Sequence, residues 1–307
     1  MHWTTNDIPR LDGKTILITG ANSGLGLETA RALARHGPRL ILACRSREKA
    51  QQASTEILSH QPDAQLEPLA LDLSDLASVR HAAREVAARH DRLDVLINNA
   101  GVMATPYMRT KDGYELQFGT NHLGHFALTG LLFALLRATP RSRVVSVSSE
   151  AHKLGQMRFD DPHWEKGYSR WPAYGTSKLA NLLFTNELAR RTKRAGIDVT
   201  AAAAHPGYAN TNLQLRPLQM TDARWAEAAV KVLNPLFGQS AAMGALPQLY
   251  AATAPDVEGG DYVGPGGMFG TRGYPRKVRA RSTAYDTAAM EKLWDMSESM
   301  TRAHFGL

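Results

Sequence analysis

A tyrosine and a lysine stand four positions apart in the segment Tyr174-Gly175-Thr176-Ser177-Lys178. Residues spaced i and i+4 share one face of a helix, so a phenol and an ammonium group come together here. An unperturbed tyrosine has a pKa of about 10. Because a neighbouring cation favours the phenolate, we expect Lys178, helped by an oxidised nicotinamide, to lower the pKa of Tyr174 toward the working pH and make it a useful proton donor or acceptor.

A glycine-rich segment far upstream complements this pair. It follows an apolar run, precedes a helical pattern and has the spacing G-x-x-x-G-x-G. Glycines allow a tight turn and a close approach of backbone to a pyrophosphate, while the following helix N-terminus supplies N–H donors and partial positive charge. In this context the segment predicts a dinucleotide site built from Gly20, Asn22, Ser23, Gly24, Leu25 and Gly26.

The residues after the second apolar run indicate which nicotinamide cofactor fits. An acidic residue there would hold the ribose hydroxyls of NAD. This chain has Cys44-Arg45-Ser46-Arg47 instead, and a guanidinium binds a phosphate through two parallel hydrogen bonds. We therefore expect NADP(H), with Arg45 and Ser46 at its 2′-phosphate. The alternative is a surface arginine pair, which would leave the ribose without a ligand here.

Short apolar runs alternate with helical patterns and must position these residues. Strands are expected at 15–19, 39–43, 66–71, 93–98, 142–148, 199–204 and 261–263, and helices at 25–36, 48–60, 76–90, 114–136 and 173–195. Continuously apolar strands separated by helices imply a parallel sheet covered on both faces. The prediction is a doubly wound α/β fold of Rossmann type with about seven strands, with its ligands at the carboxyl ends of the strands.

A single domain is expected over residues 1–307, because no linker, internal repeat or low-complexity segment interrupts the pattern. Two segments, about 151–172 and 209–245, are long and carry apolar side chains near the expected site. They suggest a small lid over a lipophilic pocket. Packing onto the core or a dimer interface would explain them equally well, and residues 213–237 could also contact a membrane surface.

Composition restricts the class of protein. The net charge is +7, but the basic residues are scattered among acidic ones, which favours a solvated surface and anionic ligands over a nucleic-acid site. The single cysteine, Cys44, excludes an intramolecular disulfide. No apolar run reaches the roughly 18 residues that span a bilayer, and the first residues lack the pattern of a signal peptide. We expect a cytoplasmic protein without an integral membrane segment.

Several further motifs accompany the glycine segment and the Tyr174–Lys178 pair. They are Asp72-Leu73, Asn98-Asn99-Ala100-Gly101, Asn121, Ser149, and Pro206-Gly207 with Thr211. In this order they resemble the short-chain dehydrogenase/reductase family over nearly the whole chain. The segments 43–45, 121–126 and 177–181 look like the branch of the retinol dehydrogenases, the WW-domain oxidoreductases and the protochlorophyllide reductases.

The resemblance implies roles for individual residues. Tyr174 would be the proton donor or acceptor and Lys178 would bind the nicotinamide ribose. Ser149, the second serine of its pair, would hold the substrate oxygen, and Asn121 would anchor a water that passes protons to the lysine. The cofactor would also contact Asp72 and Leu73 at its adenine, Asn98, Ala100 and Gly101 beside its ribose, and Pro206, Gly207 and Thr211 at its nicotinamide.

These observations predict an NADPH-dependent oxidoreductase that interconverts a lipophilic ketone or aldehyde and its alcohol. A reductase of C=C bonds and a non-catalytic NADPH sensor are the alternatives. His122 and His125 are i and i+3 without an acid cluster, so no metal site is expected. The family often forms dimers or tetramers through the helices that carry Asn121 and Tyr174; Leu179, Leu182, Leu183 and Leu188 would suit such an interface or the core.

Overall fold

One sheet of eight strands forms the centre of the computed structural model, which describes residues 2–208, 239–267 and 270–307. Its strand order is β3-β2-β1-β4-β5-β6-β7-β8. All neighbouring strands from β3 to β7 are parallel, and β8 runs antiparallel to β7. The strands are β1 Thr15–Thr19, β2 Arg39–Cys44, β3 Gln65–Ala70, β4 Val95–Asn98, β5 Ser142–Val147, β6 Val199–Ala204, β7 Tyr262–Pro265 and β8 Pro275–Val278.

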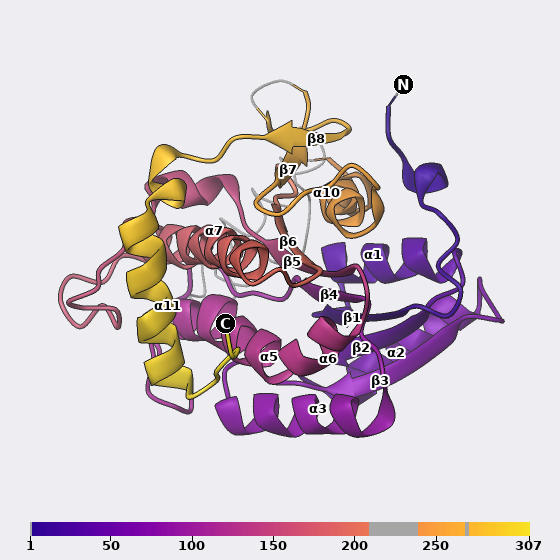
Figure 1. Ribbon diagram of the computed structural model, residues 1–307, viewed down its shortest axis with the longest axis horizontal. Coiled ribbons are helices and arrows are strands. Elements are labelled where there is room, and N and C mark those ends of the chain that lie inside the picture. Colours follow the sequence, from indigo (N-terminus) through magenta and orange to yellow (C-terminus); the bar gives the residue numbers. More distant parts are fainter. Residues whose placement is uncertain (1, 209–238, 268–269) are drawn as a thin grey trace, which may run out of the picture.

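Helices cover both faces of the sheet (Figure 1). One layer contains α1 (Gly24–Ala34), α2 (Arg47–Leu58) and α10 (Ala241–Thr253). The other contains α3 (Leu76–Arg89), α5 (Gly124–Leu131), α6 (Phe133–Ala138) and α7 (Arg170–Arg194). The last helix, α11 (Thr287–Thr301), lies on the outer side of α7 and α5.

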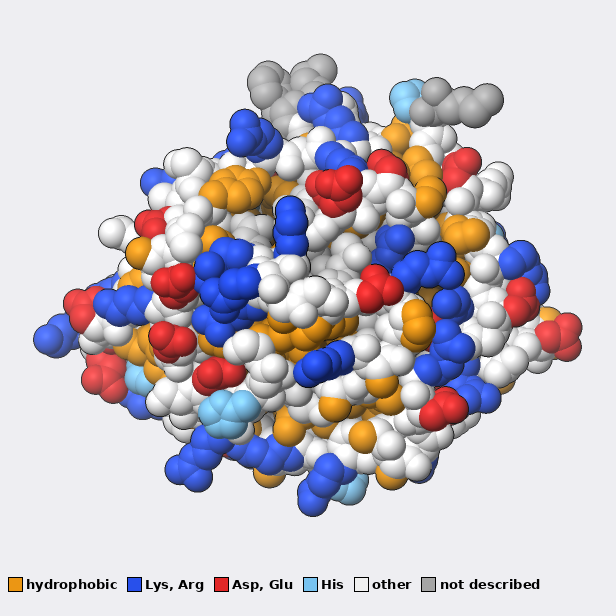
Figure 2. Space-filling model, in the orientation of Figure 1, with side chains coloured by type: hydrophobic (Ala, Val, Ile, Leu, Met, Phe, Trp, Pro, Cys, Tyr) orange, Lys and Arg blue, Asp and Glu red, His pale blue; other side chains and the backbone are white. Residues whose placement is uncertain are grey.

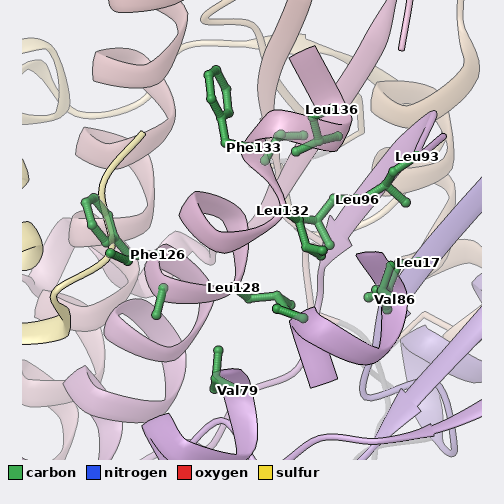
Figure 3. Packing of buried hydrophobic residues seen from close by; sticks show 14 of the residues in the cluster. Leu17, Val79, Val86, Leu93, Leu96, Phe126, Leu128, Leu132, Phe133 and Leu136 are labelled. Atoms are coloured by element: carbon green, nitrogen blue, oxygen red, sulfur yellow. The ribbon is translucent and has the colours of Figure 1, made fainter. Parts of the chain in front are cut away.

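The two faces of a strand divide the core between these layers. Successive strand side chains point to opposite faces. In β1, Ile16 and Ile18 therefore belong to the cluster under α1 and α10, while Leu17 belongs to the cluster under α3 and α5. Figure 3 shows the second cluster, where Leu17 and Leu96 of the sheet lie with apolar side chains of the covering helices. Both faces of the central strands are thus apolar, as the continuous runs predicted.

The predicted doubly wound fold is confirmed, with corrections at its edges. The sheet has an eighth strand, β8, which is antiparallel. This strand has only four residues, and two of them, Arg276 and Lys277, are exposed, so the sequence shows no apolar run there. The single helix expected over 114–136 is instead α4 (Leu116–Phe118), a π-helical turn over Gly119–Leu123, α5 and α6. The C-terminal helices α10 and α11 were not predicted, and α10 begins inside the expected lid segment 209–245.

Candidate active site at the carboxyl ends of the central strands

Helix α7 carries Tyr174 and Lys178 one turn apart, as the spacing predicted. Both side chains are buried, and Lys178 Nζ lies 5.7 Å from the centre of the Tyr174 ring. The ammonium group donates to the carbonyl oxygen of Val147, at the end of β5, over 3.0 Å. Asn181 Nδ2 donates to the same oxygen over 3.2 Å, so the strand end holds the catalytic face of the helix in place.

The two serines after β5 have different environments. Ser149 lies in the turn that precedes the 3-10 helix η3 (Glu150–Leu154), and its hydroxyl lies close enough to the Tyr174 phenol to lower the pKa of that group. Ser148 is buried, and its hydroxyl donates to the carbonyl oxygen of Lys178 over 2.8 Å. Ser148 therefore fastens α7 to the sheet, whereas Ser149 faces Tyr174.

Asn121 sits in the π-helical turn Gly119–Leu123. Its side-chain Oδ1 accepts from the backbone N–H of Val102 over 2.8 Å, and Nδ2 donates to the carbonyl of Val102 and to the hydroxyl of Ser177, both over 2.9 Å. Single π turns recur at functional sites because the extra residue redirects local side chains. Here the turn allows a buried amide to tie the segment after β4 to α7, next to Lys178.

Burial changes the pKa values of the central pair. Desolvation raises the pKa of Tyr174 to about 12, and the hydrogen bond from Ser149 opposes this only in part. Desolvation also lowers the pKa of Lys178 to about 8. The expectation that Lys178 and the oxidised nicotinamide together would lower the pKa of Tyr174 is not met in the protein by itself, because desolvation dominates the pKa of the buried phenol.

The glycine segment after β1 is closely packed. Gly20 has φ +68°, and a Cβ on Gly26 would lie 2.3 Å from the carbonyl oxygen of Gly20, so neither position accepts a larger residue without movement. Ser23 precedes α1 but its side chain does not cap the first N–H groups of the helix. These donors, together with the turn from Asn22 to Leu25, are those that a pyrophosphate requires.

Asn99, which sequence reasoning left out of the site, joins three elements there. Its Nδ2 donates to the carbonyl of Thr19 over 2.7 Å, and its backbone N–H donates to the Thr19 hydroxyl over 2.9 Å. Gln248 of α10 donates to Asn99 Oδ1 over 3.3 Å. The Asn98-Asn99-Ala100-Gly101 motif was noticed, but only the fold reveals that its second asparagine holds the glycine turn.

Of the other predicted cofactor residues after β4, Ala100 and Gly101 lie near the glycine turn or the Tyr174–Lys178 pair, whereas Asn98 faces the core. Ala100 packs against Gly20, and Gly101 lies against Asn121 and Lys178. Asn98 is buried and its amide donates to Thr129 of α5 over 3.0 Å, so it faces the core.

Among the residues expected at the adenine, Asp72 Oδ1 accepts from the N–H and the hydroxyl of Ser74, and Leu73 is buried against Gly124. Asp72 therefore keeps its carboxylate in a short turn after β3.

Arg45 follows β2 directly and its side chain is exposed. Among the described residues it forms no ion pair, so its guanidinium is available to an anionic ligand. Ser46 caps α2 by accepting from the N–H of Lys49 over 3.3 Å, and it also donates to Glu48 over 2.5 Å. The neighbouring Arg47 is exposed as well, as the first residue of α2.

The turn after β6 carries the predicted cofactor residues Pro206 and Gly207. Gly207 has φ +63°, and a Cβ there would lie 2.3 Å from the carbonyl oxygen of Thr271, which explains the glycine. Gln239 donates to the carbonyl of Pro206 over 2.6 Å. Thr211 and residues 213–237, which were predicted as a cofactor contact and as a lid, interface or membrane contact, lie outside the described residues, as does most of the segment 209–245.

The segment 151–172 is tied to the rest of the fold rather than detached from it. Trp164 is buried, with the Arg158 guanidinium 4.5 Å from its ring. The Tyr168 hydroxyl accepts from Gln117 Nε2 and donates to the carbonyl of Thr105, both over 2.9 Å. By contrast Trp171 is 51% exposed, with its ring edge-on to Tyr174 at 6.2 Å.

His122 and His125 serve the packing of α5. His125 Nε2 lies 2.9 Å from the Thr19 hydroxyl and its Nδ1 lies 2.9 Å from the Asn121 carbonyl oxygen, while His122 Nε2 lies 2.8 Å from the Ser297 hydroxyl. Burial lowers the pKa of His125 to about 4 and that of His122 to about 3. In the part of the chain that the structure describes, no group of three or more His, Cys, Asp and Glu side chains could hold a metal ion.

The surface does not gather its positive charge in one place on the face that Figure 2 displays. Lys and Arg occur there in several groups with Asp and Glu among them (Figure 2). Within residues 2–208, 239–267 and 270–307, no helix combines the length and the apolar character that crossing a bilayer requires.

Comparison with known proteins gives concordant results. The family model for short chain dehydrogenase matches residues 14–220. Retinol dehydrogenase 14 of Mus musculus is 42% identical over 305 residues, which cover 94% of this chain and 86% of that protein. Retinol dehydrogenase 12 of Mus musculus is 42% identical over 296 residues, covering 96% and 87%.

Solved structures share the architecture. An uncharacterized protein from Mycobacterium Paratuberculosis superposes with a TM-score of 0.82 at 44% identity, covering 100% of both chains. A short chain dehydrogenase from Shigella flexneri, complexed with NADP, has a TM-score of 0.65 at 22% identity and covers 83% of this chain and 98% of its own. The second likeness concerns the fold alone.

Proposed function

The chain belongs to the short-chain dehydrogenase family, in its retinol dehydrogenase-like branch, and from that premise we propose that it is an NADPH-dependent oxidoreductase of lipophilic carbonyls and alcohols. It would interconvert a ketone or aldehyde and the corresponding alcohol. One observation carries the proposal. The Tyr174 phenol lies beside the Ser149 hydroxyl, with its ring centre 5.7 Å from the Lys178 ammonium, at the carboxyl ends of the strands where the glycine turn also lies.

The residues present fit a nicotinamide dinucleotide. The uncapped start of α1 and the close contact between Gly20 and Gly26 form a cradle that side chains would fill. In this proposal Asp72 and Leu73 hold the adenine, Asn98, Ala100 and Gly101 lie along the ribose side, and Pro206, Gly207 and Thr211 hold the nicotinamide. Exposed Arg45, with Ser46 beside it, would bind the 2′-phosphate and favour NADP(H) over NAD(H).

The bound nicotinamide would supply or accept the hydride, and the side chains of this chain would move the proton. Tyr174 would donate its phenolic proton to the carbonyl oxygen during reduction, while Ser149 stabilises the charge that develops on that oxygen. Lys178 would hold the nicotinamide ribose and supply positive charge beside the phenol. Asn121, fixed by Val102 and Ser177, would keep the proton path to Lys178 in place.

The substrate class rests on apolar surface around Tyr174. Large hydrophobic side chains are normally buried, yet Leu154 and Trp171 are 61% and 51% exposed. The Trp171 ring lies against that of Tyr174, and the backbone of Leu154, in η3, lies against Gly175 of α7. A carbonyl carried by an apolar molecule would bury this surface on binding. The named substrates of the relatives fit this chemistry, since retinol is an apolar alcohol.

Cys44 argues against the alternative of a C=C reductase that uses a cysteine as proton donor. Its thiol is buried in β2 and burial raises its pKa to about 11, so it is neither ionised nor accessible at neutral pH. Retention of the complete Asn121, Ser149, Tyr174 and Lys178 set argues against a non-catalytic sensor. A cytoplasmic location remains part of the proposal, and imaging of the tagged full chain in its own cells would test it.

The decisive experiment measures cofactor oxidation against a panel of lipophilic ketones and aldehydes. NADPH and NADH are compared, with wild-type protein and Tyr174→Phe. We expect NADPH-selective turnover that falls by about a thousandfold or more in the variant, because general acid catalysis contributes about 10²–10⁴-fold. Tight NADPH binding without turnover of any panel member would favour the sensor, and equal turnover by Tyr174→Phe would remove Tyr174 from the mechanism.

A further inference from the structure

Two buried histidines have their rings in contact with that of Tyr262 of β7. His152 belongs to η3 and His205 follows β6. Their rings lie 5.8 and 5.0 Å from the Tyr262 ring, and all three side chains are at most 3% exposed. None of them has a part in the proton transfer described above. However, His152 contacts the backbone of Ser149, and His205 contacts Glu150, the residue after Ser149.

The hydrogen bonds of His152 define a single tautomer. The backbone N–H of Arg281 donates to His152 Nε2 over 3.1 Å, so this nitrogen carries no proton. The other nitrogen, Nδ1, lies 2.7 Å from the carbonyl oxygen of Ser149, which can only accept. His152 is therefore neutral with its proton on Nδ1, and it connects the C-terminal segment to the residue that carries the catalytic hydroxyl.

His205 has the opposite tautomer by the same reasoning. The backbone N–H of Gly207 donates to His205 Nδ1 over 3.3 Å, so the proton belongs on Nε2. That nitrogen lies 3.5 Å from the carboxylate of Glu150, the residue after Ser149. A Cβ on Gly264 would lie 1.9 Å from His205 Nε2, so the ring fits only because position 264 is glycine.

The two rings thus hold two turns that must face each other. His152 fixes the carbonyl of Ser149, and His205 bridges Glu150 to the Pro206–Gly207 turn. Both rings pack against Tyr262. The distance between the Ser149 hydroxyl and the turn expected at the nicotinamide decides whether a carbonyl carbon can lie in reach of the hydride.

We propose that His152 and His205, each in its neutral tautomer, are positioning residues that set the Ser149 turn against the Pro206–Gly207 turn. This proposal rests on the proposed function. Protonation of His152 would turn Nε2 into a donor facing the Arg281 N–H, and protonation of His205 would turn Nδ1 into a donor facing the Gly207 N–H. Release of the Ser149 turn through His152 would lower turnover without loosening the glycine segment, whereas release of the Pro206–Gly207 turn through His205 would also weaken the contact proposed at the nicotinamide.

The charged neighbours set the pH at which this occurs. His152 is faced by Glu150 and Lys153 of its own element, by Arg281 and by the phenol of Tyr262; His205 is faced by Glu150, Lys153, His152 and Tyr262. Burial outweighs the attraction of Glu150 and lowers the pKa of both histidines, that of His205 to about 4. Neutral rings are therefore expected throughout the working range, with an acidic limb of the rate profile at lower pH.

The test compares His152→Ala and His152→Gln with wild type across pH. A glutamine can both donate to the Ser149 carbonyl and accept from the Arg281 N–H, and it does not titrate. We expect kcat to fall about 10–100-fold in the alanine variant with the Kd for NADPH within twofold of wild type, and the glutamine variant to recover most of the rate with a weaker acidic limb. The matched control is His90→Gln, at another buried histidine, which is the C-cap of α3 and lies beside Glu67 of β3.

A folded alanine variant with the wild-type kcat, or a glutamine variant with an unchanged acidic limb, would overturn the proposal. Should the alanine variant not fold, the glutamine profile still decides. Nitrogen-15 NMR of the imidazoles gives a readout that needs no turnover: we expect the Nδ1–H tautomer for His152 and the Nε2–H tautomer for His205. Other tautomers refute this proposal alone, whereas absence of wild-type turnover with these tautomers present refutes the proposed function alone.

Discussion

At the scale of single residues, burying the Lys178 ammonium group lowers the stability of the folded protein. Lys178 is 3% exposed, and among the described residues its ammonium group donates one hydrogen bond, to the carbonyl oxygen of Val147. Desolvation lowers the pKa of Lys178 to about 8 from an ordinary 10.5. A protein without a need for this charge would place an apolar side chain here, since an imperfectly paired buried ion destabilises the fold.

Lys178→Met should therefore stabilise the protein without cofactor while it weakens function. Methionine removes the buried charge, and Val147 keeps its second donor from Asn181. We expect a gain of about 1–3 kcal/mol at pH 7 from calorimetry or denaturant unfolding. Because the folded pKa lies below the unfolded value, the unfolded state binds more protons between about pH 8 and 10.5. Wild-type stability should rise with pH across that window, so the advantage of the variant should shrink there.

The same variant should bind NADPH more weakly and turn over more slowly, as the ribose contact requires. Isothermal titration and steady-state rates measure both quantities. Unchanged NADPH affinity would contradict the ribose contact of Lys178, and a loss of stability at pH 7 would contradict the cost of burying its charge.

Arg45→Glu tests the second residue-scale claim, the preference for NADP(H). Loss of a charge-assisted phosphate contact costs about 1.5–3 kcal/mol, so the Kd for NADPH should rise about 10–100-fold while that for NADH changes little. Arg137→Glu makes the same charge change at an exposed position of α6, the helix before β5, and should alter neither value. An equal loss for both cofactors would remove Arg45 from the phosphate site.

At the scale of elements, close backbone contact between η3 and α7 keeps Ser149 near Tyr174. A Cβ on Gly175 would lie 2.6 Å from the carbonyl oxygen of Ala151, and a Cβ on Gly155 would lie 2.4 Å from that of Gly175. The Thr176 hydroxyl also donates to the carbonyl of Gln156 over 2.9 Å. Glycine is thus kept inside a helix where it would otherwise be unfavourable, because η3 must approach the backbone of α7.

Gly175→Ala separates these two effects. Helix propensity alone would stabilise the protein by about 1 kcal/mol, whereas forcing η3 away from α7 should cost about 1–3 kcal/mol. We expect net destabilisation in thermal unfolding and a lower kcat, since Ser149 moves with η3. Ala87→Gly, at an exposed position of α3, measures the propensity effect in this chain. A stabilised and fully active Gly175→Ala variant would show that η3 can shift without consequence.

At the scale of the whole molecule, helix α11 covers the outer face of α5 and α7, so this face is buried within the subunit. Trp294 is 2% exposed and lies among the rings of Phe126, Phe184 and Phe305, with the Arg191 guanidinium 4.5 Å from its own ring. The leucines 179, 182, 183 and 188 are buried inside the subunit. The predicted homodimer or homotetramer stays a prediction, but a dimer on this face would have to displace α11.

Trp294→Ala should therefore weaken the fold strongly and expose the α5–α7 face. Truncation of a buried tryptophan costs about 3–5 kcal/mol. We expect a large fall in unfolding free energy and, in light scattering, a shift toward larger species as the face becomes apolar surface. Trp171→Ala, at a half-exposed tryptophan, should change stability by less than about 1 kcal/mol. Similar losses in both variants would contradict the role of α11 as a cover.

The sequence by itself determined the features that depend on near neighbours in the chain. The apolar runs predicted the parallel sheet, the glycine spacing predicted the turn before α1, and the i, i+4 spacing placed Tyr174 beside Lys178. Strand and helix periods are local properties, so a few residues suffice to reveal them. The prediction of one long helix over 114–136 was wrong. The helix is interrupted by a π turn, and within that turn Asn121 contacts Val102, which is 19 positions away in the chain.

Only the tertiary structure decided what depends on residues far apart in the chain. The pKa values of Tyr174 and Lys178 reversed the expectation because desolvation is caused by every element packed around them. The bond between His152 and Arg281 spans 129 positions, and the cover of α5 by α11 joins segments with no common pattern. Solvent exclusion and long-range packing are properties of the assembled fold, so no local spacing could contain them.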